Sequence, residues 1–214
     1  MVEQRNAERI GVVGMGYVGL PLAVAFGQQN HVVGFDINEQ RIADLTRGVD
    51  ETHEADVEKF SRADIEFTTD PALLASCSAI VVAVPTPVDP AKHPDLGPVI
   101  AASRAVGRVL QPGTVVVFAS TVYPGVTEDV CRPILEEESG LKLGEFALGY
   151  SPERINPGDR EHTLETVVKV VSGHDSATLG RVAALYRQII TAGVHEAPNI
   201  KTAEAAKVIE NIQR

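Results

Sequence analysis

The sequence predicts an α/β fold, a Rossmann-type doubly wound, mostly parallel sheet with helices on both faces. Short β-branched runs alternate with helical segments from residue 9 onward, which is typical of βαβ units. The runs over 78–84 and 114–119 are apolar almost throughout, as strands buried on both faces of a sheet are. A glycine-rich turn joins the first run to the first helical segment, as in many doubly wound folds.

The alternation assigns most of the chain to single elements. Asn38 is expected to cap the second helix and Gly48 to end it, whereas Pro71 takes the first position of a short third helix. Thr127 is expected to cap a later helix that Pro133 kinks. The acidic stretch 48–64 carries no clear pattern. The expected strands cover 9–14, 31–36, 65–69, 78–84, 114–119, 145–150 and 167–173, and the expected helices cover 17–29, 38–48, 70–77, 99–110, 127–137 and 175–190.

Composition restricts the class of protein. The 214 residues are 44% hydrophobic and 22% charged, which is ordinary for a globular chain. The formal net charge of -10 repels nucleic acid and anionic membranes, and no apolar run is long enough to cross a membrane. Cys77 and Cys131 form neither a metal spacing nor a disulfide framework, and the six histidines show no metal spacing either. We therefore expect a cytoplasmic protein with no metal site and no nucleic-acid or membrane partner.

The segment "GVVGMGYVGLPLA" places Gly14, Gly16 and Gly19 in a G-x-G-x-x-G pattern between a strand and a helix. Gly14 permits a tight turn, Gly16 lets the backbone approach a pyrophosphate, and Gly19 allows the helix to pack closely on the strand. Tyr17 and Val18 lie at the start of the helix, where free N–H groups attract phosphates. The pattern predicts a dinucleotide site, and a purely structural glycine-rich turn is the alternative.

An acidic residue ends the second expected strand. Asp36 lies 17 residues after Gly19, where a carboxylate accepts hydrogen bonds from both ribose hydroxyls of a dinucleotide. A carboxylate there repels a 2′-phosphate, so the sequence favours NAD over NADP. Arg41 lies nearby, and it can instead flank the adenine or tolerate a phosphate.

Two further strand ends carry hydroxyl side chains. The fourth expected strand runs into Val84, Pro85 and Thr86, and the fifth runs into Ser120 and Thr121. Ligands of open α/β sheets lie beyond the carboxyl ends of the strands, so these residues should face the cofactor. For Ser120, a purely structural cap is an equally good interpretation.

The last segment, "KTAEAAKVIENIQR", predicts the opening turns of a helix. Thr202 can cap it, Glu204 falls in its first turn, and Lys207 and Asn211 share one face at a spacing of four residues. The stripe expected to face the protein consists of Ala203, Ala206, Ile209 and Ile212. Taken alone, Lys207 and Asn211 would be an exposed polar face, and Glu153 beside Arg154 an ordinary loop ion pair.

Five motifs in order carry a family resemblance: "GMGYVGLPLA", "VPTPVD", "STVYPG", "GYSPERINPGD" and "AEAAKVIENIQR". Together they resemble the UDP-sugar 6-dehydrogenases, and most of all the branch that acts on UDP-N-acetylhexosamines. In that family an N-terminal NAD domain and a C-terminal UDP domain are joined by a central helix, through which dimers commonly pack. The resemblance implies an NAD domain over 1–200, the start of the central helix over 201–214 and a second domain beyond it.

The resemblance also implies chemistry. The family oxidises the sugar C6 hydroxymethyl group to a carboxylate with two NAD, through a cysteine thioester. Thr121 resembles the hydroxyl that touches the nicotinamide side, and Glu153 resembles the carboxylate that serves thioester hydrolysis. Lys207 and its partner Asn211 resemble the pair that stabilises charge on the substrate oxygen. Arg154 and Ile155 resemble substrate contacts, as do Glu153, Lys207 and Asn211.

Two departures from the family limit this interpretation. The residues after "PE" are not the apolar run followed by an acid that is typical of the UDP-glucose branch, which favours UDP-N-acetylglucosamine, -galactosamine or -mannosamine as substrate. The family's nucleophilic cysteine motif is absent, so we expect these 214 residues to be inactive alone. The alternatives are a stand-alone NAD-binding module, a UDP-glucose 6-dehydrogenase, or a Rossmann oxidoreductase of the 3-hydroxyacid or 6-phosphogluconate type.

Overall fold

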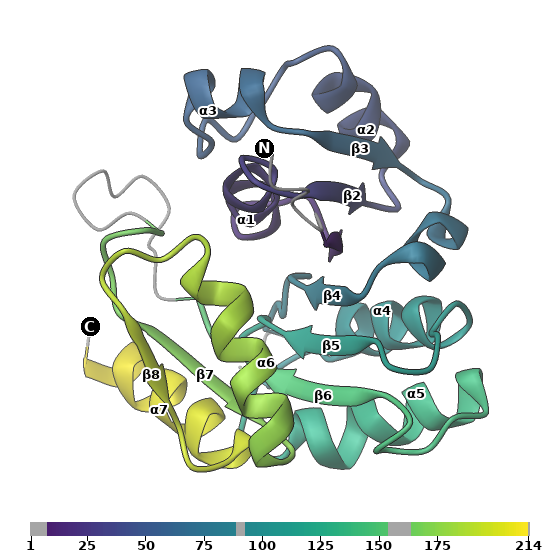
Figure 1. The fold of residues 1–214 in the computed structure, drawn as a ribbon, viewed down its shortest axis with the longest axis vertical. Coiled ribbons are helices and arrows are strands. Elements are labelled where there is room, and N and C mark those ends of the chain that lie inside the picture. The colour runs from purple at the N-terminus through teal and green to yellow at the C-terminus, as the bar shows by residue number, and fades with distance from the viewer. Residues whose placement is uncertain (1–7, 89–92, 154–163, 214) are drawn as a thin grey trace, which may run out of the picture.

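A computed structural model describes residues 8–88, 93–153 and 164–213. Its strands form one sheet in the order β3-β2-β1-β4-β5-β6-β7-β8, drawn in Figure 1. The strands are β1 (Arg9–Val13), β2 (His31–Phe35), β3 (Ile65–Thr68), β4 (Ala79–Val82), β5 (Val115–Phe118), β6 (Ala147–Tyr150), β7 (Lys169–Gly173) and β8 (Val194–Glu196). All neighbours pair in parallel except β6 and β7, so the predicted doubly wound, mostly parallel sheet is confirmed.

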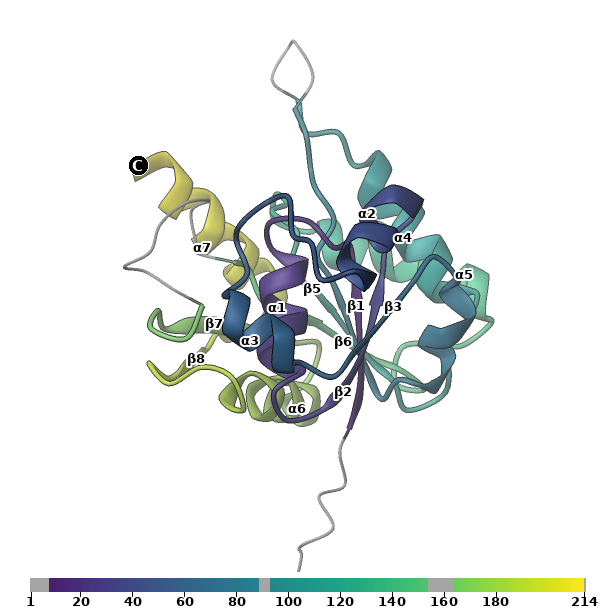
Figure 2. The same cartoon turned by 90° about the horizontal axis from the view of Figure 1, so that it is seen from above.

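Helices cover both faces of this sheet. Seen from above in Figure 2, α1, α3 and α6 lie on one side, and α4 and α5 lie on the other. Alternate strand residues feed two separate apolar clusters, one with α1 and α6 and one with α4, α5 and the start of α7. The helical segments are α1 (Gly19–Phe26), α2 (Glu39–Thr46), α3 (Val57–Arg62), η1 (Pro71–Ser76), α4 (Gly97–Gly107), η2 (Val126–Cys131), α5 (Arg132–Ser139), α6 (Ser176–Arg187) and α7 (Ile200–Gln213).

Several local predictions are confirmed. The Asn38 side chain accepts a hydrogen bond from the Arg41 N–H and caps α2, and Gly48 follows that helix with a φ of 78°. Pro71 is at the first position of η1, a 3₁₀ helix that the Asp70 side chain caps. The unassigned stretch 48–64 contains α3, and β8 is a strand that the sequence pattern did not predict.

The two helices nearest the expected active site begin differently from the prediction. Thr127 does not cap its helix, because η2 starts after Gly125 as a π-helical segment and continues into α5, with Pro133 at the start of the latter. Thr202 does not cap α7 either: the Asn199 side chain accepts a hydrogen bond from the Thr202 N–H at 2.8 Å. The capping residue therefore lies outside the segment that the sequence pattern assigned to the helix.

The buried face of α7 is also not the predicted one. Ile209 and Ile212 are 56% and 78% exposed, whereas Glu204 and Lys207 are buried with Ala203. The predicted apolar stripe is wrong beyond its first residue: Ile200 and Ala203 pack in the apolar cluster, and beside them the buried face carries Glu204, held by hydrogen bonds, and Lys207. The hydrogen bonds of Glu204 are described with the candidate site below.

The turn after β1 yields a stability prediction. A Cβ atom on Gly19 would stand 1.6 Å from the carbonyl oxygen of Gly14, so neither backbone can yield without moving β1 or α1. We expect Gly19→Ala to lower the free energy of unfolding by about 3 kcal/mol, measured by urea denaturation followed by circular dichroism. Gly180→Ala, in α6 with open space around it, is the control and should be neutral or slightly stabilising. Equal midpoints for Gly19→Ala and the unmodified chain would contradict the steric argument.

Candidate cofactor and substrate site

Each glycine of the glycine-rich turn has its own structural surroundings. Gly14 has a φ of +93°, and a Cβ there would meet the carbonyl oxygen of Ala83 in the β4 loop at 2.9 Å. Gly19 packs against Gly14 itself, which brings α1 directly onto the end of β1. A Cβ atom on Gly16 would have no neighbour within 4 Å, so the backbone there faces open space. The geometry suits a pyrophosphate approaching Gly16.

At the start of α1, no side-chain cap or acidic residue competes with a ligand for the free backbone N–H groups. No side chain caps it, and no acidic residue lies in its first turn. Tyr17, at 58% exposure, and the half-buried Val18 lead into the helix. An anion at this helix start therefore meets the positive end of the helix dipole with no carboxylate of the first turn to oppose it.

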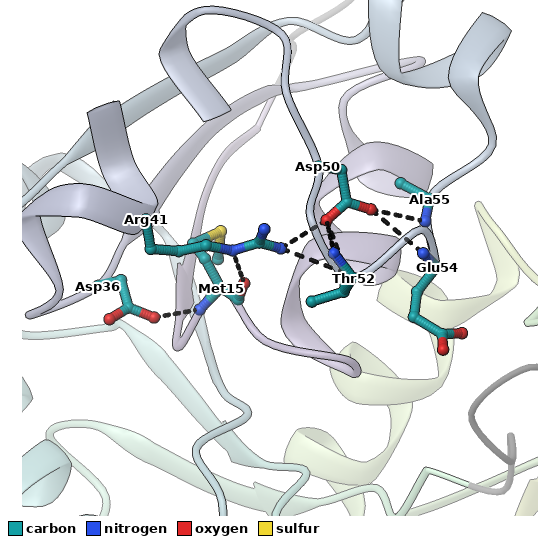
Figure 3. A network of polar contacts seen from close by, with 7 residues as sticks. All are labelled: Met15, Asp36, Arg41, Asp50, Thr52, Glu54 and Ala55. Atoms are coloured by element: carbon teal, nitrogen blue, oxygen red, sulfur yellow. Dashed lines mark hydrogen bonds and ion pairs between the residues drawn. The ribbon is translucent and has the colours of Figure 1, made fainter. Parts of the chain in front are cut away.

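Asp36 is held in place by the backbone. Its Oδ2 accepts a hydrogen bond from the Met15 N–H at 2.7 Å, and its Oδ1 accepts one from the Asn38 N–H at 2.9 Å. Each carboxylate oxygen keeps a second lone pair for a further donor. The bond to Met15 joins the end of β2 to the glycine turn, so the two predicted parts of the cofactor site lie together (Figure 3).

Arg41 is anchored on the same residue from the other side. Its Nε donates to the Met15 carbonyl oxygen at 2.9 Å, and its Nη2 donates to Asp50 Oδ1 at 2.8 Å and to Thr52 Oγ1 at 3.4 Å. Figure 3 shows the guanidinium stretched between Met15 and Asp50. Nη1 is buried and has no hydrogen-bond partner among the described residues. Because Nη1 is shielded from solvent, a ligand could reach it only if the guanidinium moved.

Asp50, which the sequence pattern did not single out, organises the loop after α2. Its Oδ1 accepts from the N–H and hydroxyl of Thr52, at 3.0 and 2.6 Å, and its Oδ2 accepts from the N–H groups of Glu54 and Ala55, both at 3.2 Å. Burial by itself raises the pKa of Asp50, but the hydrogen bonds from Thr52, Arg41 and Ala55 outweigh it and hold the pKa below its usual value.

Hydroxyl groups tie the two strand-end loops together. Ser120 Oγ donates to the carbonyl oxygen of Val84 at 2.6 Å, and Thr86 Oγ1 donates to the carbonyl oxygen of Thr121 at 2.7 Å. The hydroxyl of Ser120 is thus used structurally, but it joins two loops and does not cap a helix. Thr121 is exposed, and so is Pro85. The loops after β4 and β5 thus form one unit beside the glycine turn.

Glu153 lies in a buried ion pair. Lys169 Nζ, at the start of β7, donates to Glu153 Oε2 at 2.8 Å, and both side chains are almost fully buried. The same Nζ stands 5.0 Å from the ring centroid of Tyr186 in α6. The sequence pattern suggested Arg154 as the partner of Glu153, but Arg154 and Ile155 lie outside the described residues. Lys169 was missed because it sits inside an otherwise apolar strand pattern.

A carboxylate on α7 holds the loop after Thr121. Glu204 is fully buried, and its Oε2 accepts from the Gly125 N–H at 2.6 Å while its Oε1 accepts from the Thr127 N–H at 2.9 Å. It therefore acts at the start of η2 rather than at the start of its own helix. Lys207, one turn further along α7, is also buried, with Glu210 at 3.8 Å from its Nζ. Asn211 is exposed, so the predicted pair does not share one environment in this chain.

Two other kinds of site are absent from the described part of the chain. No group of three or more His, Cys, Asp or Glu side chains there is arranged to hold a metal ion. No helix in the same ranges is long and apolar enough to cross a membrane.

Comparison with known proteins places this geometry in a family. The model of the UDP-glucose/GDP-mannose dehydrogenase family, NAD-binding domain, matches residues 8–190. The chain belongs to this family. It is 54% identical over 206 residues to Protein CapL of Staphylococcus aureus and 53% identical over 208 residues to the UDP-N-acetyl-D-glucosamine 6-dehydrogenase of Pseudomonas aeruginosa. Both alignments cover 96% of this chain and 49% of the relative.

A solved structure agrees with the sequence relatives. The NDP-N-acetyl-D-galactosaminuronic acid dehydrogenase of Methanosarcina mazei Go1 superposes with a TM-score of 0.89 at 35% identity, over 97% of this chain and 47% of that one. The chain thus spans about half the length of the relatives it matches. NAD is the cofactor of this domain family, and the glycine turn, Asp36 and Arg41 suit it.

The Glu204 bridge predicts a cost that a surface carboxylate would not show. In Glu204→Gln, one of the two N–H donors would face an amide N–H₂ instead of an oxygen. We expect a loss of about 2 kcal/mol in the free energy of unfolding, measured by urea denaturation. Glu137→Gln, which changes an exposed carboxylate of α5, is the matched control and should be neutral. If both variants unfolded at the same midpoint, the two hydrogen bonds would contribute nothing net.

Proposed function

We propose that this chain is the NAD-binding half of a nucleotide-sugar dehydrogenase that oxidises C6 of a UDP-N-acetylhexosamine to the uronate with two NAD. The observation that carries the proposal is the 53% identity, over almost the whole chain, to a relative named UDP-N-acetyl-D-glucosamine 6-dehydrogenase. UDP-N-acetylgalactosamine and UDP-N-acetylmannosamine are the other candidate substrates. The product class fits surface polysaccharide biosynthesis in the cytoplasm.

Different residues of this chain would contact the adenosine, the pyrophosphate and the nicotinamide half of NAD. Asp36 would accept hydrogen bonds from the adenosine ribose, and Arg41 would flank that end of the molecule. The backbone from Gly14 to Gly19, with Tyr17 and Val18, would receive the pyrophosphate. The nicotinamide half of NAD would be lined by the two loops that follow β4 and β5, with Val84, Pro85 and Thr86 in the first and Ser120 and Thr121 in the second. NAD supplies the hydride acceptor that the oxidation of an alcohol requires.

The remaining residues would serve the sugar. Thr121, with its exposed side chain at the end of β5, would act beside the reacting carbon, and Glu153 would position the water of the hydrolysis step. Lys207 would stabilise negative charge on the substrate oxygen with Asn211 as its partner. Arg154 and Ile155 would contact substrate. Supporting this assignment, Glu153 and Lys207 are buried charged groups, and such groups are retained mostly where they have a partner or a task.

Domain organisation and assembly follow from the same proposal. Residues 1–200 would form the NAD domain, and 201–214 would begin a central helix that leads to a UDP-sugar domain. The exposed Ile209 and Ile212 of α7 would then be covered by that domain or by a second subunit, which favours a homodimer through this helix.

Calorimetry and absorbance on the purified chain test the proposal. We expect the chain to bind NAD, and Asp36→Ala to weaken binding at least about tenfold because two ribose hydrogen bonds are lost. Glu137→Ala is the control for the removal of a carboxylate. With UDP-N-acetylglucosamine or its isomers the chain alone should form no NADH, whereas the same chain continued by a family UDP-sugar domain should form it.

Two results would overturn parts of the proposal separately. Steady NADH formation by the 214 residues alone would place a complete catalytic site within them. Binding of NAD without oxidation of any of the three sugars by the extended protein would favour a binding module, and oxidation of UDP-glucose instead would change the substrate.

A further inference from the structure

Two side chains at the adenosine end of the site, Asp36 and Arg41, have opposite effects on the binding of a 2′-phosphate. A carboxylate at the position of Asp36 excludes a 2′-phosphate, whereas an arginine nearby accommodates one in NADP-dependent relatives of the Rossmann fold. Arg41 is the only cation between Asp36 and Thr46. Both side chains bond to Met15, Asp36 to its N–H and Arg41 to its carbonyl oxygen, so they lie next to each other. Whether the site prefers NAD or NADP therefore depends on whether the charge of Arg41 is available to a 2′-phosphate.

The structure shows that this charge is already engaged. Only 10% of the Arg41 side chain is exposed, and its Nη2 forms a salt bridge of 2.8 Å with Asp50, whose own side chain is 8% exposed. The Nε is bonded to a backbone carbonyl that cannot move without the glycine turn. Charge-assisted hydrogen bonds of this kind, away from solvent, are among the stronger polar contacts in proteins.

Asp50 cannot easily release the guanidinium. Its two oxygens together accept from three backbone N–H groups and one hydroxyl, so the carboxylate is fixed by the loop over 50–55. Drawing Arg41 toward a phosphate would leave a nearly buried carboxylate without its cation, which is costly. The loop therefore resists the rearrangement that an extra phosphate would need.

We propose that Asp50 is a cofactor-specificity residue, which sequesters Arg41 so that the adenosine ribose at Asp36 meets a carboxylate while the charge of Arg41 is withheld. Asp36 repels a 2′-phosphate directly, and Asp50 removes the compensating charge. The two effects are coupled, because Asp36 and Asp50 belong to one network that runs through Met15 and Arg41. The proposal rests on the placement of the adenosine ribose at Asp36 given under the proposed function.

The test compares the affinities of NAD and NADP for the purified chain by calorimetry. In Asp50→Asn the carbonyl oxygen can still accept from Thr52 while the negative charge is lost. We expect the ratio of NADP to NAD affinity to rise about tenfold, which corresponds to one freed charge-assisted contact. Combining Asp50→Asn with Arg41→Met should return the ratio to its original value, because the gain depends on the arginine.

Asp44→Asn is the matched control. The side chain of Asp44 is similarly buried and lies on α2, but it bonds to Arg47 and Gln40 and reaches Arg41 only through a weaker Coulomb attraction. Asp44→Asn should therefore change the ratio much less than Asp50→Asn does. Should Asp50→Asn fail to fold by circular dichroism, Asp50→Ser offers a smaller acceptor for the same N–H groups and carries the same expectation.

The outcomes separate this proposal from the one it rests on. An unchanged ratio in a folded Asp50 variant that still binds NAD would overturn the role of Asp50, and so would a raised ratio that persists in the Arg41→Met background. Loss of NAD binding in Asp36→Ala with no effect of Asp50 would leave the cofactor site standing. A folded chain that binds neither nucleotide would instead overturn the cofactor placement itself.

Discussion

The contact between Gly19 and the carbonyl of Gly14 is the constraint on which the site depends. It allows α1 to begin directly on the end of β1, with no side chain between them. Because α1 begins there, the turn residue Met15 points its N–H at the end of β2 and its carbonyl at α2. Asp36 and Arg41 then take their positions from that one residue. A side chain at Gly19 would push α1 away from the end of β1 and displace the turn that holds Met15.

Buried charged groups do a second kind of structural work in this chain. Asp50 holds the loop after α2, Glu153 joins Lys169 between the end of β6 and β7, and Glu204 fixes the start of η2 to α7. The ties of Asp50 and Glu204 join segments that no strand pairing connects, and the Glu153–Lys169 pair extends the contact between β6 and β7 beyond their ladder. Each would be costly to bury without its partner, so the ties stabilise one arrangement of the loops rather than contributing general cohesion.

The sequence predicted the parts of the fold and site that act locally. The order of strands and helices, the cap at Asn38 and the roles of Gly14 and Gly19 follow from patterns within a few residues, and Asp36 follows from the known spacing of the dinucleotide-binding motif. The three ties, with partners 9, 16 and 79 residues apart, belong to no such motif, and a single sequence does not show which segments meet. The same reason explains the error on α7.

That error has a clear physical origin. Helical periodicity assigns the inward face to apolar residues, and on α7 this selects Ala206, Ile209 and Ile212. In the structure Glu204 and Lys207 are buried instead. Two backbone N–H groups at the start of η2 are buried and require a hydrogen-bond acceptor, which the Glu204 carboxylate supplies. The spacing of three between Glu204 and Lys207 was the available signal, since both fall on one helix face.

The electrostatics of the whole chain agree with those of its cofactor site. A net charge of -10 sets a field that disfavours anions, yet the domain must bind a dinucleotide. Backbone N–H groups and a helix start attract a pyrophosphate through short-range dipoles, and these work inside the roughly 8 Å over which salt screens the surface charge. The helix start beside Asp36, that of α2, is capped by the Asn38 side chain and carries Glu39 in its first turn, which disfavours a further anion. Among the described residues of this region, Arg41 is already paired with Asp50. The site would thus discriminate against the 2′-phosphate of NADP in two ways: Asp36 repels it, and the pairing of Arg41 with Asp50 removes a cation that could bind it.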